Sequence, residues 1–132
     1  MAGNPGSALS QKLGIRPWAK VALIEPPHGF TLLLPDDAAL VDSAVRNVDV
    51  MVWFVLGRSS LDRRFDQTVA RLQPSGTLWI VWPKKGAGVP TDMAEEIVRE
   101  VGQAKGRLVD QRVVPFDATW NGLRVVARLA TK

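Results

Sequence analysis

The residue types best suited to bind or transform a small molecule come directly after apolar runs of this sequence. Glu25 and His28 follow the run KVALI and lie three positions apart. Histidine exchanges protons readily near neutral pH, and a partner carboxylate usually accompanies it in acid–base catalysis. His28 could therefore act as a base assisted by Glu25, or it could be an ordinary loop histidine. No recognisable catalytic motif surrounds the pair, which favours the ordinary loop histidine.

A second group of candidates follows the run LWIV, in the segment WPKKGAG. Lys84 and Lys85 could capture a phosphate or a carboxylate, and the glycines behind them would let the segment close over the anion. A lysine pair that merely keeps a loop solvated is the favoured alternative. Trp82 could stack on a flat ring, although aromatic side chains more often pack in a core.

Three further residues complete the set of candidates. Arg58 and Ser59 come just after the apolar run DVMVWFVL, where a helix is expected to begin. They would present a cation and a hydroxyl group to a ligand. Trp120 lies in a loop between the last two expected strands and is a second residue that could stack on a ring. Packing is again the favoured alternative for this indole.

Composition excludes several classes of function. A chain of 132 residues fits one domain, without cysteine and with a single histidine. Disulfides, thiol catalysis, thiolate metal sites and multi-histidine zinc sites are therefore excluded. The 17 basic residues are scattered among 13 acidic ones, so nucleic-acid binding is not expected despite a net charge of +4.

No apolar run reaches about 18 residues and no signal-peptide pattern is present. A soluble cytoplasmic protein without membrane contact is expected.

Hydrophobic periodicity predicts the elements that must position these residues. Continuously apolar runs predict strands covered on both faces at Lys20–Glu25, Asp49–Leu56 and Thr77–Trp82. Two more strands are expected at Leu108–Val114 and Leu123–Leu129, joined through a turn at Asn121-Gly122. The segment Ala38–Asp42 fits either a weak strand or a helix.

Apolar residues at spacings of three and four predict two amphipathic helices. The first begins at Ser59 and ends at Pro74 and Gly76, and the second begins at Asp92 and ends at Gly106. Short helical segments are expected at Leu9–Leu13 and His28–Leu34. Residues 1–8 are expected to form a flexible terminus, and residues 9–132 a single domain.

Buried strands that alternate with helices predict an α/β domain of three-layer, Rossmann-like architecture. Its sheet would be mostly parallel, with helices on both faces and an antiparallel pair of strands at the C-terminus. Ligands of open α/β sheets bind outside the carboxyl ends of the parallel strands. All the candidate residues would share that edge, namely Glu25, His28, Arg58, Ser59, Trp82, Lys84, Lys85 and Trp120.

From Asp49 onward the sequence resembles the C-terminal half of class I S-adenosylmethionine-dependent methyltransferases. The resemblance rests on the order of VDVMVWFV, the turn and strand LQPSGTLWIVWP, the helix TDMAEEIVREVGQAKG and the terminal strands. Nearly the whole chain is also similar to a bacterial domain-of-unknown-function family, through LSQKLGIRP, VALIEPPHGF, WPKK…TD and DATWNGLRVV. These resemblances imply a shortened methyltransferase-like domain.

The sequence departs from the methyltransferase pattern where the cofactor would bind. Methyltransferases have a glycine-rich loop after the first strand, whereas this chain has EPPHGF. Pro26 and Pro27 have no N–H group to donate. We therefore expect a non-catalytic domain that binds a small anionic molecule or a protein, including a second copy of itself, without a cofactor or a metal. The alternative is a diverged transferase that uses S-adenosylmethionine, with Glu25 or His28 as the base.

Overall fold

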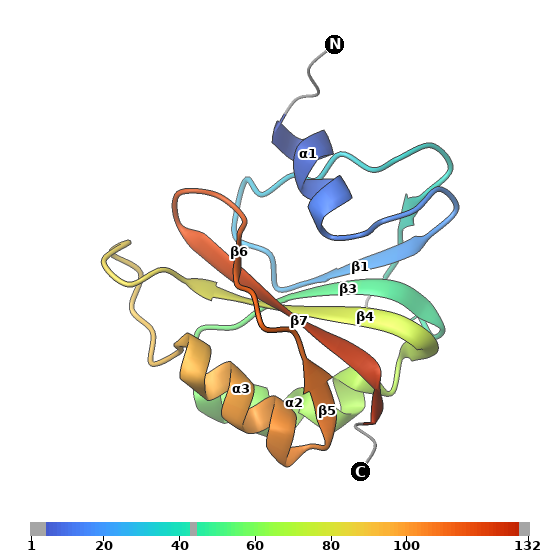
Figure 1. Cartoon of the computed structure of the whole chain (residues 1–132). Helices are drawn as coiled ribbons and strands as arrows, with labels where there is room; N and C mark the ends of the chain where they lie inside the picture. The colour runs from blue at the N-terminus through green and yellow to red at the C-terminus, as the bar shows by residue number, and fades with distance from the viewer. Residues whose placement is uncertain (1–4, 43–44, 130–132) are drawn as a thin grey trace.

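The computed structural model describes residues 5–42 and 45–129 and, for residues 5–8 and 127–129, the backbone alone. A seven-stranded mixed sheet forms its centre, in the order β2-β1-β3-β4-β7-β5 with β6 beside β7 (Figure 1). The strands are β1 (Lys20–Ile24), β2 (Ala39–Leu40), β3 (Val48–Phe54), β4 (Leu72–Pro83), β5 (Arg107–Val109), β6 (Val114–Pro115) and β7 (Trp120–Leu129).

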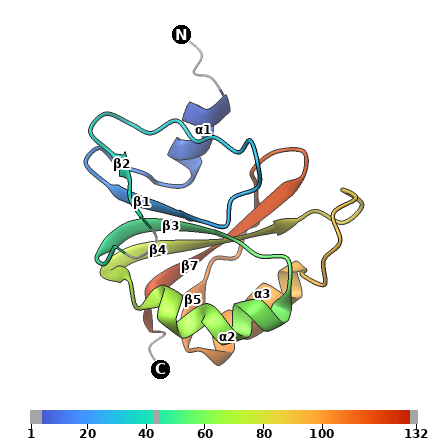
Figure 2. The same cartoon turned by 180° about the vertical axis from the view of Figure 1, so that it is seen from behind.

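The three-layer, Rossmann-like architecture predicted from the sequence is confirmed. Strands β2, β1, β3 and β4 are parallel, and β7 is antiparallel to β4, β5 and β6. Helices α2 (Arg58–Val69) and α3 (Glu95–Ala104) cover one face, and α1 (Pro5–Lys12) lies on the other (Figures 1 and 2). Residues 5–8, expected in the flexible terminus, are helical, and residues 1–4 lie outside the described part.

Two apolar clusters fill the spaces on either side of the sheet. Met51 and Trp53 of β3, with Val55 just after it, belong to the cluster beneath α2 and α3, where Leu61 and Phe65 of α2 meet them. The intervening residues of β3 belong to the cluster on the α1 face. This alternation explains the continuous apolar runs, because the side chains of Val50–Phe54 in the central strand β3 are all buried, on one face or the other.

Helix α2 ends at Val69, five residues before the predicted stop at Pro74, and β4 begins at Leu72. Pro74 lies within an irregular stretch of β4, because Val48 pairs with Leu72 whereas Val50 pairs with Thr77. A Cβ atom on Gly76 would lie 2.9 Å from the carbonyl oxygen of Gln73. The turn residues therefore shape a bulge inside the strand, and the prediction that they end the helix is wrong.

Two other predicted features differ from the structure. The segment His28–Leu34 is not helical, because Gly29 has φ +84° and a turn closes from the N–H of Phe30 to the carbonyl of Pro27 at 3.0 Å. The predicted turn at Asn121-Gly122 lies inside β7. The chain reverses just before it, where the Asp117 carboxylate accepts hydrogen bonds from the N–H groups of Thr119 and Trp120 at 2.8 and 2.9 Å.

The predicted strand at Leu108–Val114 is also divided into two short strands, β5 and β6. Between them, Asp110 accepts a hydrogen bond from the N–H of Gln111 at 2.8 Å and pairs with Arg124 of β7 at 3.2 Å. A charged residue in the middle of the segment is thus used to turn the chain. Both short strands still pair antiparallel to β7, as the sequence predicted for the terminal strands.

Candidate functional site

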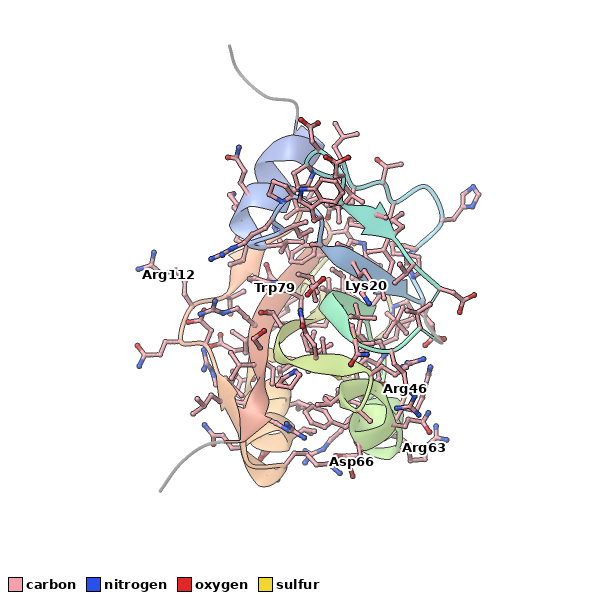
Figure 3. The ribbon with its side chains drawn as sticks, turned by 90° about the vertical axis from the view of Figure 1, so that its right-hand side faces the viewer. Lys20, Arg46, Arg63, Asp66, Trp79 and Arg112 are labelled. Carbon is pink, nitrogen blue, oxygen red and sulfur yellow. The ribbon has the colours of Figure 1, made fainter. Side chains whose placement is uncertain are left out.

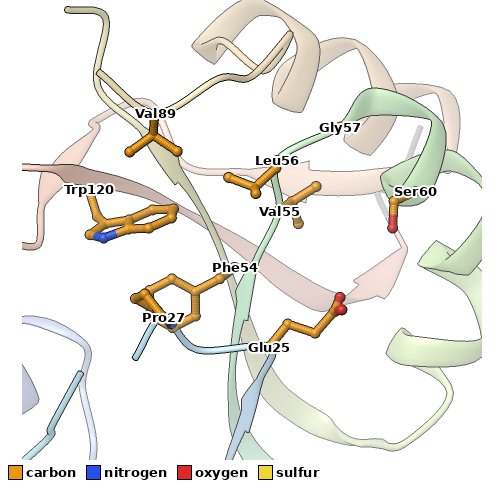
Figure 4. Close-up of a pocket in the computed structure, with 9 residues that line it drawn as sticks. All are labelled: Glu25, Pro27, Phe54, Val55, Leu56, Gly57, Ser60, Val89 and Trp120. Carbon is orange, nitrogen blue, oxygen red and sulfur yellow. The ribbon is translucent and has the colours of Figure 1, made fainter. Parts of the chain in front are cut away.

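A cavity of about 510 Å³ opens at the carboxyl ends of β1 and β3, the edge at which a ligand site was expected (Figure 4). We call it the strand-end pocket. Its walls come from five segments: the chain after β1, the chain after β3, the first turn of α2, the loop after β4 and the first residue of β7. Pockets of this volume hold small organic ligands in other proteins.

Strand register explains why these segments meet. Ile24 at the end of β1 pairs with Trp53, and Trp53 pairs with Ile80 of β4. Strands β1 and β3 therefore end within one residue of each other, and β4 continues beside them to Pro83. Glu25 then takes a left-handed backbone conformation with φ +52°, which turns the chain sharply away from the sheet. Gly57 leads β3 into α2, and its backbone forms part of the pocket wall.

One end of the strand-end pocket is aromatic. The rings of Phe54 and Trp120 meet edge to face, with centroids 5.3 Å apart, and the rings of Phe30 and Phe54 also meet edge to face, with centroids 4.9 Å apart. Val89 of the loop after β4 lies on the same side of the pocket as Trp120 (Figure 4). Rings held in this way present a rigid apolar surface to a flat ligand.

The other end of the pocket is polar. Glu25 and Ser60 contribute a carboxylate and a hydroxyl group there (Figure 4). Arg64 of α2 donates a hydrogen bond to the Glu25 carboxylate at 2.8 Å, and its guanidinium group lies 6.0 Å from the centre of the Trp53 ring. The pair orients the Glu25 carboxylate and compensates its charge. The polar end of the pocket therefore offers a hydrogen-bond acceptor that Arg64 holds in place.

Hydrogen bonds hold the loop after β4 against the beginning of α2. The Thr91 hydroxyl donates to the carbonyl of Leu56 at 2.6 Å and accepts from the N–H of Met93 at 2.9 Å. Asp92 accepts a hydrogen bond from the N–H of Arg58 at 2.8 Å. Asp92 therefore caps α2, whereas α3 begins at Glu95 after Ala94, which makes no side-chain cap. The predicted role of Asp92 in opening the second helix is wrong.

The structure brings two of the predicted site residues, Glu25 and Trp120, to the walls of the strand-end pocket. Arg58 is adjacent to it, but its guanidinium group pairs with Glu100 at 3.1 Å and with Asp62 at 3.6 Å. Its side chain thus connects α2 to α3. Ser59 is exposed beside the pocket, and the next residue, Ser60, lines the wall in its place.

The remaining predicted residues are not among those that line the pocket. Trp82 is 4% exposed and packs in the cluster beneath α2 and α3. Lys84 is partly exposed, with its N–H bonded to the carbonyl of Thr119 at 2.7 Å, and Lys85 is exposed. His28 is exposed in the turn after β1. Capture of an anion by Lys84 and Lys85 stays a prediction.

Sequence reasoning missed the apolar residues that make up most of the wall, including Pro27, Phe54, Leu56 and Val89. Polar, charged and tryptophan side chains were sought as ligand contacts, whereas three of these four are apolar types that normally indicate a core and Pro27 is a type that normally indicates a turn. Leu56 carried a usable signal, because it follows a buried strand and precedes a helix N-terminus. It is 49% exposed in the structure.

Among the residues that the structure describes, no group of three or more histidine, aspartate or glutamate side chains is placed to hold a metal ion. The helices of this same part of the chain include none long and apolar enough to cross a membrane.

Comparison with solved structures identifies the fold. The chain is similar to an S-adenosylmethionine-dependent methyltransferase from Aquifex aeolicus, with 15% identity, a TM-score of 0.68, and coverage of 95% of this chain and 90% of that one. It is also similar to the 1,6-didemethyltoxoflavin-N1-methyltransferase of Burkholderia thailandensis, whose structure contains 1,6-didemethyltoxoflavin and S-adenosylhomocysteine. The identity there is 16%, the TM-score 0.60, and the coverage 97% and 78%.

A third similar structure is the fibrillarin pre-rRNA processing protein of Methanococcus jannaschii, with 16% identity, a TM-score of 0.54 and coverage of 98% and 77%. No family model matches the sequence, and no curated protein matches it either. The fold is therefore methyltransferase-like. Identities this low establish the fold alone.

Proposed function

We propose that this domain binds a small molecule with a flat apolar body in the strand-end pocket and performs no chemistry on it. The observation that carries the proposal is the pocket itself, with the rings of Phe54 and Trp120 at one end and the held carboxylate of Glu25 at the other. A ligand whose ring contacts Trp120 and whose hydrogen-bond donor reaches Glu25 would match both ends.

The absence of catalysis in this proposal rests on the residues around the pocket. Glu25 is the titratable side chain among the described lining residues, and Arg64 occupies one of its carboxylate oxygens. The two prolines after β1 supply no N–H groups to a phosphate or a carboxylate. Binding by shape and apolar contact needs neither a free catalytic base nor backbone N–H donors. A cytoplasmic location and the identity of the partner stay predictions.

Binding can be tested with prodan, a neutral naphthalene dye whose emission moves to shorter wavelength in an apolar site. We expect saturable binding with one site per chain. Val89→Glu places a carboxylate in the apolar wall and should weaken this binding at least tenfold. The matched control is Ala87→Glu, which adds the same charge to the same loop at a residue that does not line the pocket. Equal losses in both variants would contradict the proposal.

The second candidate function is an S-adenosylmethionine-dependent transferase, with Glu25 as the base. The similarity to the Aquifex aeolicus and Burkholderia thailandensis methyltransferases supports it. This function predicts saturable heat, with one site per chain, when the protein is titrated with S-adenosylhomocysteine. If no heat appears while prodan still binds, the transferase is rejected and the binding domain is retained.

A further inference from the structure

A second cavity, of about 580 Å³, lies at the opposite edge of the sheet, where the parallel strands begin. Figure 3 views the side of the molecule on which Lys20, the first residue of β1, is labelled. The segment before β1 forms one wall of this cavity, and β3, β4 and β7 form the others. We call it the Trp18 cavity. It shares no residue with the strand-end pocket.

Trp18 has an unusual place in this cavity. Arg16, Pro17, Trp18 and Ala19 form a tight turn closed by a hydrogen bond from the N–H of Ala19 to the carbonyl of Arg16 at 3.2 Å. Proline at the second position and φ +71° at the third are the features of a type II turn. The third position of such a turn favours glycine, and this chain has its largest side chain there.

The position of Trp18 is unfavourable in two ways. A tryptophan with positive φ is sterically strained. Its side chain also gains little from packing, because Trp18 is 76% exposed, whereas the other four tryptophans are at most 9% exposed. Glycine would satisfy the turn without either disadvantage. An exposed, rigidly held indole beside a cavity is well suited to stack on a flat ring.

The polar groups of the cavity complement an anion with several oxygens. Arg16 is exposed and forms no ion pair with another described residue. Arg124 also lines the cavity, with its Nε atom 3.2 Å from Asp110. Side chains of β4 add an amide and two hydroxyl groups, from Gln73, Ser75 and Thr77.

One carboxylate, that of Asp49, also borders the Trp18 cavity. Its Oδ2 atom accepts a hydrogen bond from the N–H of Lys20 at 2.7 Å, which directs its charge toward the backbone of β1. Because Asp110 pairs with Arg124, Arg16 is the lining guanidinium group whose charge no carboxylate of the described residues compensates. Arginine is the side chain best matched to phosphate oxygens, which it can bind in pairs.

We propose that the Trp18 cavity binds a mononucleotide, with the base stacked on the Trp18 indole and the phosphate held by Arg16. The hydroxyl groups and the amide of β4 would contact the sugar. This site stands apart from the proposed function of the strand-end pocket, because it lies at the other edge of the sheet and uses a different tryptophan.

The test uses adenosine monophosphate with the full chain and follows binding by calorimetry and by tryptophan fluorescence. Because Trp18 is the exposed indole, stacking should quench the long-wavelength part of the emission. Trp18→Gly should reduce the affinity at least tenfold while the melting temperature stays the same or rises, since glycine suits the turn. Loss of binding without loss of stability separates a ligand contact from a structural one.

Arg16→Gln should also reduce the affinity at least tenfold, and Arg112→Gln, at an exposed arginine outside the cavity, is the matched control. Val89→Glu in the strand-end pocket should leave the affinity unchanged. No quenching at millimolar adenosine monophosphate overturns the proposal. Binding that persists in both Trp18→Gly and Arg16→Gln overturns it as well, and binding lost only in Val89→Glu assigns the nucleotide to the strand-end pocket.

Discussion

Asp92 caps a helix that begins 34 residues earlier in the chain, through the hydrogen bond that it accepts from the N–H of Arg58 at 2.8 Å. The carboxylate lies at the N-terminus of α2, where the helix dipole favours negative charge. The capping carboxylate thus comes from the loop after β4, and no residue of α2 or of the segment before it supplies one. This contact also holds the loop that carries Val89 over the strand-end pocket.

Replacement of Asp92 should therefore lower stability and loosen the loop together. We expect Asp92→Ala to reduce the free energy of unfolding by about 1 kcal/mol, the usual cost of a lost helix cap. Asp92→Asn, which keeps the acceptor oxygen, should cost less. Chemical denaturation measures both values, and Asp36→Ala, at an exposed aspartate, is the control. If Asp36→Ala and Asp92→Ala cost the same, the cap contributes nothing to stability.

Gly122 should not tolerate a side chain, because a Cβ atom there would lie 2.3 Å from the Phe116 ring. We expect Gly122→Ala to reduce the free energy of unfolding by about 1–3 kcal/mol through overpacking. In a Phe116→Ala background the same substitution should cost much less, because the obstructing ring is gone. A double-mutant cycle by thermal or chemical denaturation measures the difference. Equal costs in both backgrounds would contradict this explanation.

The ion pair between Glu25 and Arg64 should contribute little to stability, because both side chains are partly exposed to solvent. We expect Glu25→Gln to change the free energy of unfolding by less than about 1 kcal/mol. The variant should still bind prodan, whose fit depends on the apolar walls. Fluorescence titration measures the affinity. A large loss of stability would show that Glu25 has a structural role beyond the pair.

The lysine pair after β4 allows a test of the predicted anion site. Substitution of both Lys84 and Lys85 by alanine should leave the affinity for neutral prodan unchanged, since neither lysine lines the strand-end pocket. An anionic naphthalene sulfonate should bind the double variant more weakly at low salt, and the difference should vanish at high salt because exposed charges are screened. Equal binding of the anionic dye by both proteins at low salt would reject the lysines as an anion site.

The central strands could be predicted from the sequence because their residues are buried by the sheet itself. The run VMVWFVL after Asp49 is apolar at every position, and β3 (Val48–Phe54) contains its first five residues. The parallel order and the antiparallel end followed from the alternation of strands and helices. The bulge at Pro74 and Gly76 could not be predicted, because the same residues commonly end a helix.

The candidate site was predicted at the correct edge of the sheet but with an incomplete set of residues. A one-residue change of position on a helix rotates a side chain by about 100°, so Ser60 faces the pocket where Ser59 was expected. Along a strand, successive side chains point to opposite faces of the sheet, and the side chain of Trp82 is on the face that packs in the core. The cap formed by Asp92 depends on a contact across 34 residues, which no local pattern encodes.

Part of the wall of the strand-end pocket belongs to the sheet, and another part belongs to the loop after β4. Phe54 and Trp120 belong to strands paired within the sheet, so these two residues can move apart only if backbone pairing is broken. Val89 is held by a loop fastened through Thr91 and Asp92, and both contacts are near the surface. A molecule that enters the pocket from solvent would thus have to displace a loop held by two hydrogen bonds. The rate of binding should depend on how often this loop opens, whereas the affinity for the bound molecule should come from its contacts with the fixed rings of Phe54 and Trp120.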